Sequence, residues 1–149
     1  MERDFDFLHG HWRVANRRLK DRLRGSDEWE EFDATALCRP LFAGDANVDE
    51  FTFPWGDTGL TLRLYDPGSK EWSLYWSTRS TGRLLPPVVG TFTDGVGTFY
   101  GDDTEQGRPV RVRYIWSGIT ATSAQWEQAF STDGGQTWET NWFMRLTRL

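Results

Sequence analysis

Hydrophobic and polar residues alternate along most of the chain, in short runs that are separated by turn signals. The runs are rich in Val, Thr, Phe, Tyr and Trp, and typical interruptions are Gly25-Ser26, Asp94-Gly95 and Asp133-Gly134-Gly135. Alternation with a period of two predicts antiparallel strands that turn one face toward a core. We count about ten such strands, and so many strands joined by short turns must close into a barrel or stack into a sandwich to hide their edges.

The hairpin around Asp94-Gly95 can be predicted residue by residue. Both central positions of a two-residue turn need positive φ, which this pair adopts readily. Pairing outward from the turn places Phe92 opposite Gly97 and Phe99 opposite Gly90. A glycine across from an aromatic ring lets the strand bend, as a closing barrel requires. The alternative is a plain hairpin in solvent.

Residues 12–24 fit two structures. Their apolar residues fall at helical spacing: Trp12, Ala15, Leu19 and Leu23. As a strand, the segment would instead pair with residues 28–38. The first segment is rich in Arg and the second in Asp and Glu, so antiparallel pairing would set opposite charges side by side. The charges therefore favour the strand.

These patterns predict an all-β fold, a single antiparallel up-and-down β-barrel of about ten strands. The 149 residues have room for one core of ordinary size and show no linker or repeat, so we expect residues 1–149 to form one β-barrel domain. No apolar run approaches the ~20 residues that span a bilayer, and Met1-Glu2-Arg3-Asp4 lacks a signal-peptide layout. We expect a cytoplasmic protein with no membrane partner.

Composition narrows the function classes. The net charge of −5 argues against a nucleic-acid partner, because binding phosphates needs a positive field. Aromatic residues make up 15% of the chain and include 9 Trp, enough to anchor a core or line a cavity. The single cysteine, Cys38, has no partner for an internal disulfide, and we expect an inert thiol.

Few motifs suggest catalysis or a cofactor. His9 and His11 are the only histidines, and no third ligand with metal-site spacing accompanies them, so we expect no metal and no cofactor. There is no G-x-S-x-G motif and no phosphate-binding loop. Residues 131–138, Ser-Thr-Asp-Gly-Gly-Gln-Thr-Trp, look like the Asp-box of sialidase-type propellers. Because the motif occurs once, we interpret it as a structural turn.

The segment Asp4-Phe5-Asp6-Phe7-Leu8-His9-Gly10-His11-Trp12 resembles the start of a group of uncharacterised bacterial domains that begin DFDFLxGxW. These domains are similar to the calycin, or lipocalin-like, β-barrels, which also open with a Gly-x-Trp pair. In such barrels the Trp closes one end of the cavity under a short N-terminal segment, and an Arg of the last strand often stacks on it. The resemblance implies that role for Trp12, with Arg145 or Arg148 above it. Some calycin-like domains bind haem through a late His, but no His follows His11.

The apolar faces predict an aromatic interior. Its expected lining is Leu62, Leu64, Leu74, Trp76, Val112, Tyr114, Trp116, Trp126, Phe130, Trp142 and Met144. Glu127, Arg113 and Asn141 fall on the opposite parity and should form an outer polar ladder. A mainly aromatic cavity with a few polar groups is the usual composition of a small-molecule site, and ten strands favour a hollow over a solid core. A solid core that only supports an interaction domain is the alternative.

We therefore predict binding of a hydrophobic or aromatic small molecule in the barrel. The candidate ligand-binding residues are Arg18, Asn47, Asp49, Trp76, Tyr114, Trp116, Trp126, Gln128 and Trp142. Arg18 and Asp49 either form a buried ion pair or both lie outside. The alternative function is a cofactor-free cyclase or isomerase in which Tyr114, Asp49 and Arg18 transfer protons and stabilise charge. The sequence leaves open whether the protein is an enzyme. Exposed aromatics such as Trp55 suit a homodimer.

Overall fold

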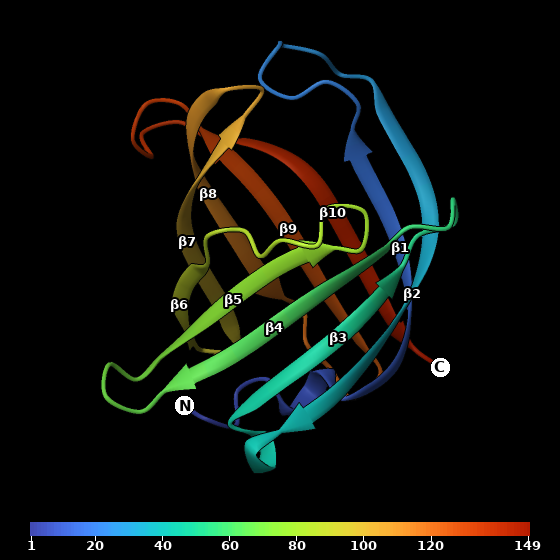
Figure 1. The fold of residues 1–149 in the computed structure, drawn as a ribbon, viewed down its shortest axis with the longest axis vertical. Coiled ribbons are helices and arrows are strands. Elements are labelled where there is room, and N and C mark those ends of the chain that lie inside the picture. Colours follow the sequence, from blue (N-terminus) through green and yellow to red (C-terminus); the bar gives the residue numbers. More distant parts are fainter.

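The computed structural model describes residues 1–149 and consists almost entirely of β-strands (Figure 1). Two short 3-10 helices, η1 (Asp6–Leu8) and η2 (Phe42–Gly44), lie near one end. The strands are β1 (Gly10–Leu19), β2 (Trp29–Leu41), β3 (Ala46–Thr52), β4 (Thr58–Asp66), β5 (Glu71–Thr78), β6 (Val88–Thr93), β7 (Val96–Glu105), β8 (Arg108–Ser117), β9 (Ser123–Ser131) and β10 (Glu139–Arg148). Neither helix has the length and hydropathy needed to cross a lipid bilayer.

Each strand pairs antiparallel with the next along the chain, and β1 also pairs with β10, so the sheet closes on itself. This confirms the predicted all-β, lipocalin-like, up-and-down barrel of ten strands. Closure removes the free edges that a sheet of this size would otherwise expose. Ten strands make the barrel wider than an eight-stranded one, whose interior is just filled by its own side chains or holds one small ligand.

The N-terminal segment closes one end of the barrel, as predicted (Figure 1). Phe5 and Leu8 are almost completely buried there, and the indole N–H of Trp12 donates to the Leu8 carbonyl at 2.8 Å. The guanidinium of Arg148 lies 4.3 Å from the centre of the Trp12 ring and donates to the carbonyls of residues 7 and 9, both at 2.6 Å. Arg148 therefore holds the plug against the last strand, whereas Arg145 lies on the outer face.

The hairpin between β6 and β7 has the predicted register. Gly90 pairs with Phe99 and Phe92 with Gly97, and Asp94 and the glycine after it both have positive φ, 52° and 78°. A Cβ on Gly97 would lie 2.7 Å from the Phe92 ring and 2.9 Å from the Phe99 ring. The glycine therefore makes room for two aromatic rings of the closed end.

Residues 12–19 form a strand and not a helix, as the charges favoured, whereas residues 20–24 of the predicted segment lie in the loop that follows. Arg13 pairs with Asp33 at 3.0 Å and Arg18 with Glu30 at 2.8 Å, across β1 and β2. Both members of the Arg13–Asp33 pair are exposed, and a pair of this kind contributes about 0–1 kcal/mol, so it guides the strand pairing more than it stabilises it.

The structure corrects the predicted direction of β4. Leu62 and Leu64 point outward, and Thr61 and Arg63 point into the barrel. Directly paired residues lie on the same face of a sheet, and Arg63 pairs with the buried Asn47 of β3. The inward direction of β3 therefore sets that of β4, whatever the polarity of its residues.

A second correction concerns Asn141, which was expected on an outer polar ladder. The register between β9 and β10 shifts between Thr140 and Trp142, and the intervening residue is the extra one of a β-bulge. As a result, Asn141 and Trp142 are both buried, at 0% and 8% exposure. Because one residue is inserted, alternation along this strand does not hold through the bulge.

The Asp-box-like segment is a turn between β9 and β10. One carboxylate oxygen of Asp133 accepts from the backbone N–H groups of Gln136 and Thr137, at 3.0 and 2.9 Å. The Thr137 hydroxyl donates to the other carboxylate oxygen. These hydrogen bonds, that of the Thr137 hydroxyl above all, hold the pKa of Asp133 well below its usual range. The Trp138 indole donates to the Gly135 carbonyl at 3.0 Å. The Asp133 carboxylate therefore accepts hydrogen bonds from its own turn and has a structural role there.

Candidate functional site

The barrel encloses a cavity of about 220 Å³ that runs from the plug to the opposite end. Seven of the nine predicted ligand-binding residues line it: Asp49, Trp76, Tyr114, Trp116, Trp126, Gln128 and Trp142. The other two, Arg18 and Asn47, do not. The cavity is smaller than the several hundred Å³ usual for ligand sites, because ring side chains occupy much of the barrel.

The cavity exists because the wall is uneven. Strands β8, β9 and β10 contribute large rings, whereas β1 and β2, beyond Trp12 at the plug, contribute the small side chains of Val14, Ala36 and Cys38. On β4, a Cβ at Gly59 would collide with the indole of Trp76, so the absence of a side chain there makes room for that ring. Small residues on one wall leave the space that the rings of the other wall do not fill.

The rings of the cavity wall are set nearly at right angles to one another. Tyr114 and Trp126 have ring centres 5.0 Å apart at 69°, and Trp126 and Trp142 have centres 5.5 Å apart at 87°. Edge-to-face pairs of this kind are favourable by about 0.5–1.5 kcal/mol beyond the area they bury. The Trp142 indole also donates to Asn16 at 2.9 Å, which fixes its orientation.

Asp49 has an ion-pair partner inside the barrel, but it is Arg63 and not Arg18. The two groups are 2.8 Å apart and almost fully buried, and Arg63 also donates to Asn47 at 2.9 Å. Asp49 further accepts from the backbone N–H of Thr61 at 3.2 Å. Neither predicted placement of Arg18 with Asp49 is right, because Arg63 turns inward and neutralises the carboxylate. Removing one member of such a pair usually costs about 3–5 kcal/mol.

Arg18 lies at the end of the barrel opposite the plug. Its guanidinium is 4.8 Å from the ring centre of Trp142, 5.0 Å from that of Phe32 and 5.5 Å from that of Trp55. It also forms the ion pair with Glu30. The residue is therefore part of an aromatic cluster at the rim, away from Asp49.

Tyr114 presents an unpaired hydroxyl to the cavity. No hydrogen bond engages it, and burial raises its pKa from 10.0 to about 12, with a smaller contribution from the Asp103 charge. At neutral pH the group is protonated and is a hydrogen-bond donor, not a base. The three residues considered for catalysis do not form one reacting group, since Asp49 is used by Arg63 and Arg18 is at the rim.

Two further polar side chains face the interior. Gln128 donates to Asn141 at 2.9 Å, which leaves its carbonyl oxygen without a hydrogen bond. Burial raises the pKa of the Cys38 thiol from 9.0 to about 11, and the nearby Arg63 lowers it less than burial raises it. The thiol is thus a poor nucleophile at neutral pH. No group of three His, Cys, Asp or Glu side chains is arranged to hold a metal ion.

The loop of residues 20–28 lies across the end of the barrel opposite the plug. Its Arg22 forms an ion pair of 3.4 Å with Glu105, and the backbone N–H of Leu23 donates to Glu139 at 2.7 Å. Leu23 has a φ of 63° and packs against the core. With the 79–87 loop, which adds Leu85 to the lining, it narrows the entrance to the cavity.

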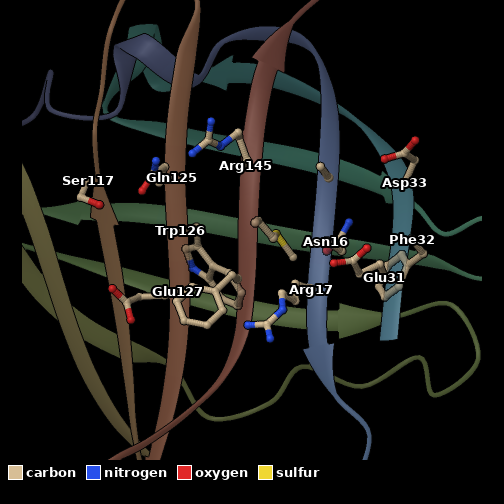
Figure 2. A pocket seen from close by; sticks show the side chains of 13 residues that line it. Asn16, Arg17, Glu31, Phe32, Asp33, Ser117, Gln125, Trp126, Glu127 and Arg145 are labelled. Carbon is tan, nitrogen blue, oxygen red and sulfur yellow. The ribbon is translucent and has the colours of Figure 1, made fainter. Parts of the chain in front are cut away.

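A larger hollow, of about 570 Å³, lies on the outer face of β9, β10, β1 and β2. Figure 2 shows Arg17, Glu127 and Arg145 around it, and small Ala15 is among its lining residues. Long charged side chains surrounding a short one produce such a depression on a solvated sheet. We take the interior cavity as the candidate site, because it lies inside the barrel and its lining is mainly hydrophobic and aromatic.

Sequence reasoning missed Arg63, the residue that pairs with Asp49. A signal was present, because the prediction already placed Asn47 and Asp49 inside the barrel. Pairing β3 with β4 through the short turn after Phe53 would have brought Arg63 to the same face. The alternating leucines of β4 instead suggested the opposite direction.

Comparison with known proteins gives a fold relationship. No family model matches the chain, and no curated protein matches it in sequence. The solved structure of the S-type phycobiliprotein lyase CPES from Guillardia theta superposes with a TM-score of 0.61, over 97% of this chain and 90% of that one, at 14% sequence identity. At that identity, the similarity shows a shared barrel fold.

Proposed function

We propose that this barrel binds a small hydrophobic or aromatic molecule in its interior cavity. The observation that carries the proposal is the cavity of about 220 Å³ inside the barrel, which is lined by the rings of Trp76, Tyr114, Trp126 and Trp142. An apolar cavity of about 150 Å³ is large enough for benzene, so this one suits a ligand with one or two rings. Tyr114 and Gln128 offer a free donor and a free acceptor that would orient it.

The structure supports binding better than catalysis. A cyclase or isomerase would need acid and base groups that converge on the ligand, and the candidate groups are separated or already paired. The phycobiliprotein lyase has the same barrel fold, and its similarity is compatible with a barrel that holds a small molecule. The shape and lining of the cavity remain the main support.

Native mass spectrometry of protein purified from its source cell tests the proposal. We expect an adduct of a small molecule on the wild-type chain. In the variant Ala36→Phe the new ring would occupy the cavity, because Ala36 lines it from β2, and the adduct should be lost. The variant Thr35→Phe is the matched control, since Thr35 is exposed on the neighbouring position of the same strand. An adduct that persists in Ala36→Phe, or none in the wild type, would contradict interior binding.

A further inference from the structure

The charged groups that line the cavity are not all neutralised. Four carboxylates contribute to the lining or its rim: Asp49, Asp102, Asp103 and Glu105. Three of them have an arginine partner: Asp49 pairs with Arg63 at 2.8 Å, Asp102 with Arg111 at 3.2 Å and Glu105 with Arg22 at 3.4 Å. Asp103 takes part in no ion pair. The cavity therefore carries one uncompensated negative charge.

That charge is directed into the barrel. Asp103 lies on β7 at the same parity as the buried Phe99 and Gly101, and it pairs across the sheet with the buried Val110. Its only hydrogen bond is from the backbone N–H of Thr104, to one carboxylate oxygen, at 2.7 Å. The second oxygen is free to accept.

Asp103 shares the cavity with Tyr114, one of its aromatic lining residues. Tyr114 lines the same cavity from β8, the strand that pairs with β7, and the Asp103 charge adds to the burial that raises the pKa of its hydroxyl. An unpaired carboxylate and an unpaired phenol hydroxyl thus line one cavity from two paired strands. An ammonium group has three N–H donors and no acceptor, so it matches the acceptor oxygen of Asp103, and the bond to this carboxylate is charge-assisted.

The aromatic wall favours the same charge. The faces of aromatic rings are electronegative and attract cations, most strongly when the cation is removed from water. Trp142 already has a guanidinium, that of Arg18, 4.8 Å from its ring centre at the rim. The indoles of the interior have the same electronic character and stand at nearly right angles around the cavity.

We propose that the ligand of the cavity is a small aromatic or hydrophobic amine, bound as its ammonium ion. Its ammonium group ion-pairs with Asp103, and its apolar part lies between Trp126, Trp142 and Tyr114. This inference rests on the proposed function, since it names the chemical class of the molecule that occupies the same cavity. A carboxylate ligand is disfavoured, because it would meet the charge of Asp103.

Three probes of nearly equal size and different charge test this proposal: 2-phenylethylamine, 2-phenylethanol and phenylacetate. Binding to the full chain at pH 7 is measured by calorimetry and by quenching of tryptophan fluorescence. We expect the amine to bind roughly tenfold or more tightly than the alcohol, because a charge-assisted hydrogen bond to Asp103 is stronger than a neutral one. Phenylacetate should bind most weakly, because its carboxylate is repelled by the charge of Asp103. The variant Asp103→Asn should reduce amine affinity to about that of the alcohol, and it should change alcohol affinity much less, because the alcohol carries no charge.

Two further variants control the experiment. Asp102→Asn removes the adjacent carboxylate, whose side chain is 84% exposed and paired with Arg111, and it should leave the amine preference intact. Asp103→Glu keeps the charge and should retain most of the preference. Equal binding of amine and alcohol by the wild type would overturn the amine proposal, and so would a preference for the amine that survives Asp103→Asn. Either result would leave the proposal of interior binding in place. Failure of all three probes would also overturn the amine proposal, and the co-purified adduct then decides the proposed function separately.

Discussion

The two halves of this barrel contain the same types of aromatic residue, but one half is a solid core and the other contains a cavity. At the plugged end, Phe5 has ring neighbours on several sides, with Trp72 and Phe92 at 5.0 and 4.9 Å between ring centres. Around the cavity, Trp126 and Trp142 pack edge to face at a similar distance, 5.5 Å, and yet border empty space. The difference lies in what faces the rings: an inserted N-terminal segment at one end, and the small side chains of β1 and β2 in the middle.

The comparison shows that ring–ring geometry alone does not distinguish a solid core from a hollow. Both halves contain perpendicular aromatic pairs at normal distances. A ring contributes its full packing energy only when atoms contact it on every side, and a ring that borders a cavity lacks those contacts on one side. The plugged end should therefore dominate the stability of the fold, and the cavity end should contribute less per ring.

The largest expected effect tests this directly by removing one ring from each half. Phe99→Ala at the plugged end should lower the free energy of unfolding by about 3–5 kcal/mol, because Phe99 is fully buried between Phe5 and Phe92. Trp126→Ala removes a larger ring, but one that borders the cavity, and its cost should fall at the low end of the same range, about 3 kcal/mol. Urea unfolding measures both losses, provided that the dependence of the unfolding free energy on urea concentration is the same in the variants and the wild type. Equal losses would show that the two halves are packed alike.

An alkaline titration examines the polar groups of the cavity half. Burial raises the pKa of Cys38 from 9.0 to about 11 and that of Tyr114 from 10.0 to about 12. Above pH 9, the unfolded chain loses these protons before the folded one, so the free energy of unfolding should fall as pH rises through this range. Each group accounts for a loss of roughly 3 kcal/mol by the time its folded pKa is passed.

Single variants separate the two contributions. Cys38→Ala should flatten the pH dependence between about pH 9 and 11, and Tyr114→Phe between about pH 10 and 12. Denaturant unfolding at several pH values gives the slopes. A wild-type stability that stays constant across this range would mean that water reaches both groups freely, and that the cavity is not closed.

The smallest effect concerns the outer surface. Leu62 belongs to the alternating leucines of β4 and points away from both halves of the interior. Leu62→Ser should therefore change the free energy of unfolding by less than about 1 kcal/mol, as partly exposed positions usually do. A loss as large as that of Phe99→Ala would restore the original interpretation of this strand as facing inward.

Local chemistry explains which parts of the fold could be predicted. The Asp94-Gly95 turn determines its own geometry, and a two-residue turn leaves one register for the strands beside it, so the pairs Phe92–Gly97 and Gly90–Phe99 followed. The charge pattern of residues 12–38 identified β1 as a strand because opposite charges match only in the antiparallel pairing. These features depend on neighbours that are close in sequence.

The parts that could not be predicted depend on partners distant in sequence or on an added residue. The leucines of β4 have the alternation of an inward face, and only the pairing with β3 shows that Arg63 points inward instead. The bulge at Asn141 has no marker such as glycine, so the change of direction there cannot be recognised. The size of the cavity depends on how all ten strands come together, which the alternation of any single strand does not contain.

The seam between β1 and β10 has a consequence for how the chain folds. Trp12 and Arg148 become cross-strand partners only when the first and last strands meet. During synthesis the early hairpins can form as they leave the ribosome, but β1 keeps one unpaired edge until β10 emerges. Contacts between residues so far apart slow folding, and an unpaired edge invites association with other chains. The sheet therefore remains prone to aggregation until β10 pairs with β1 and closes the barrel.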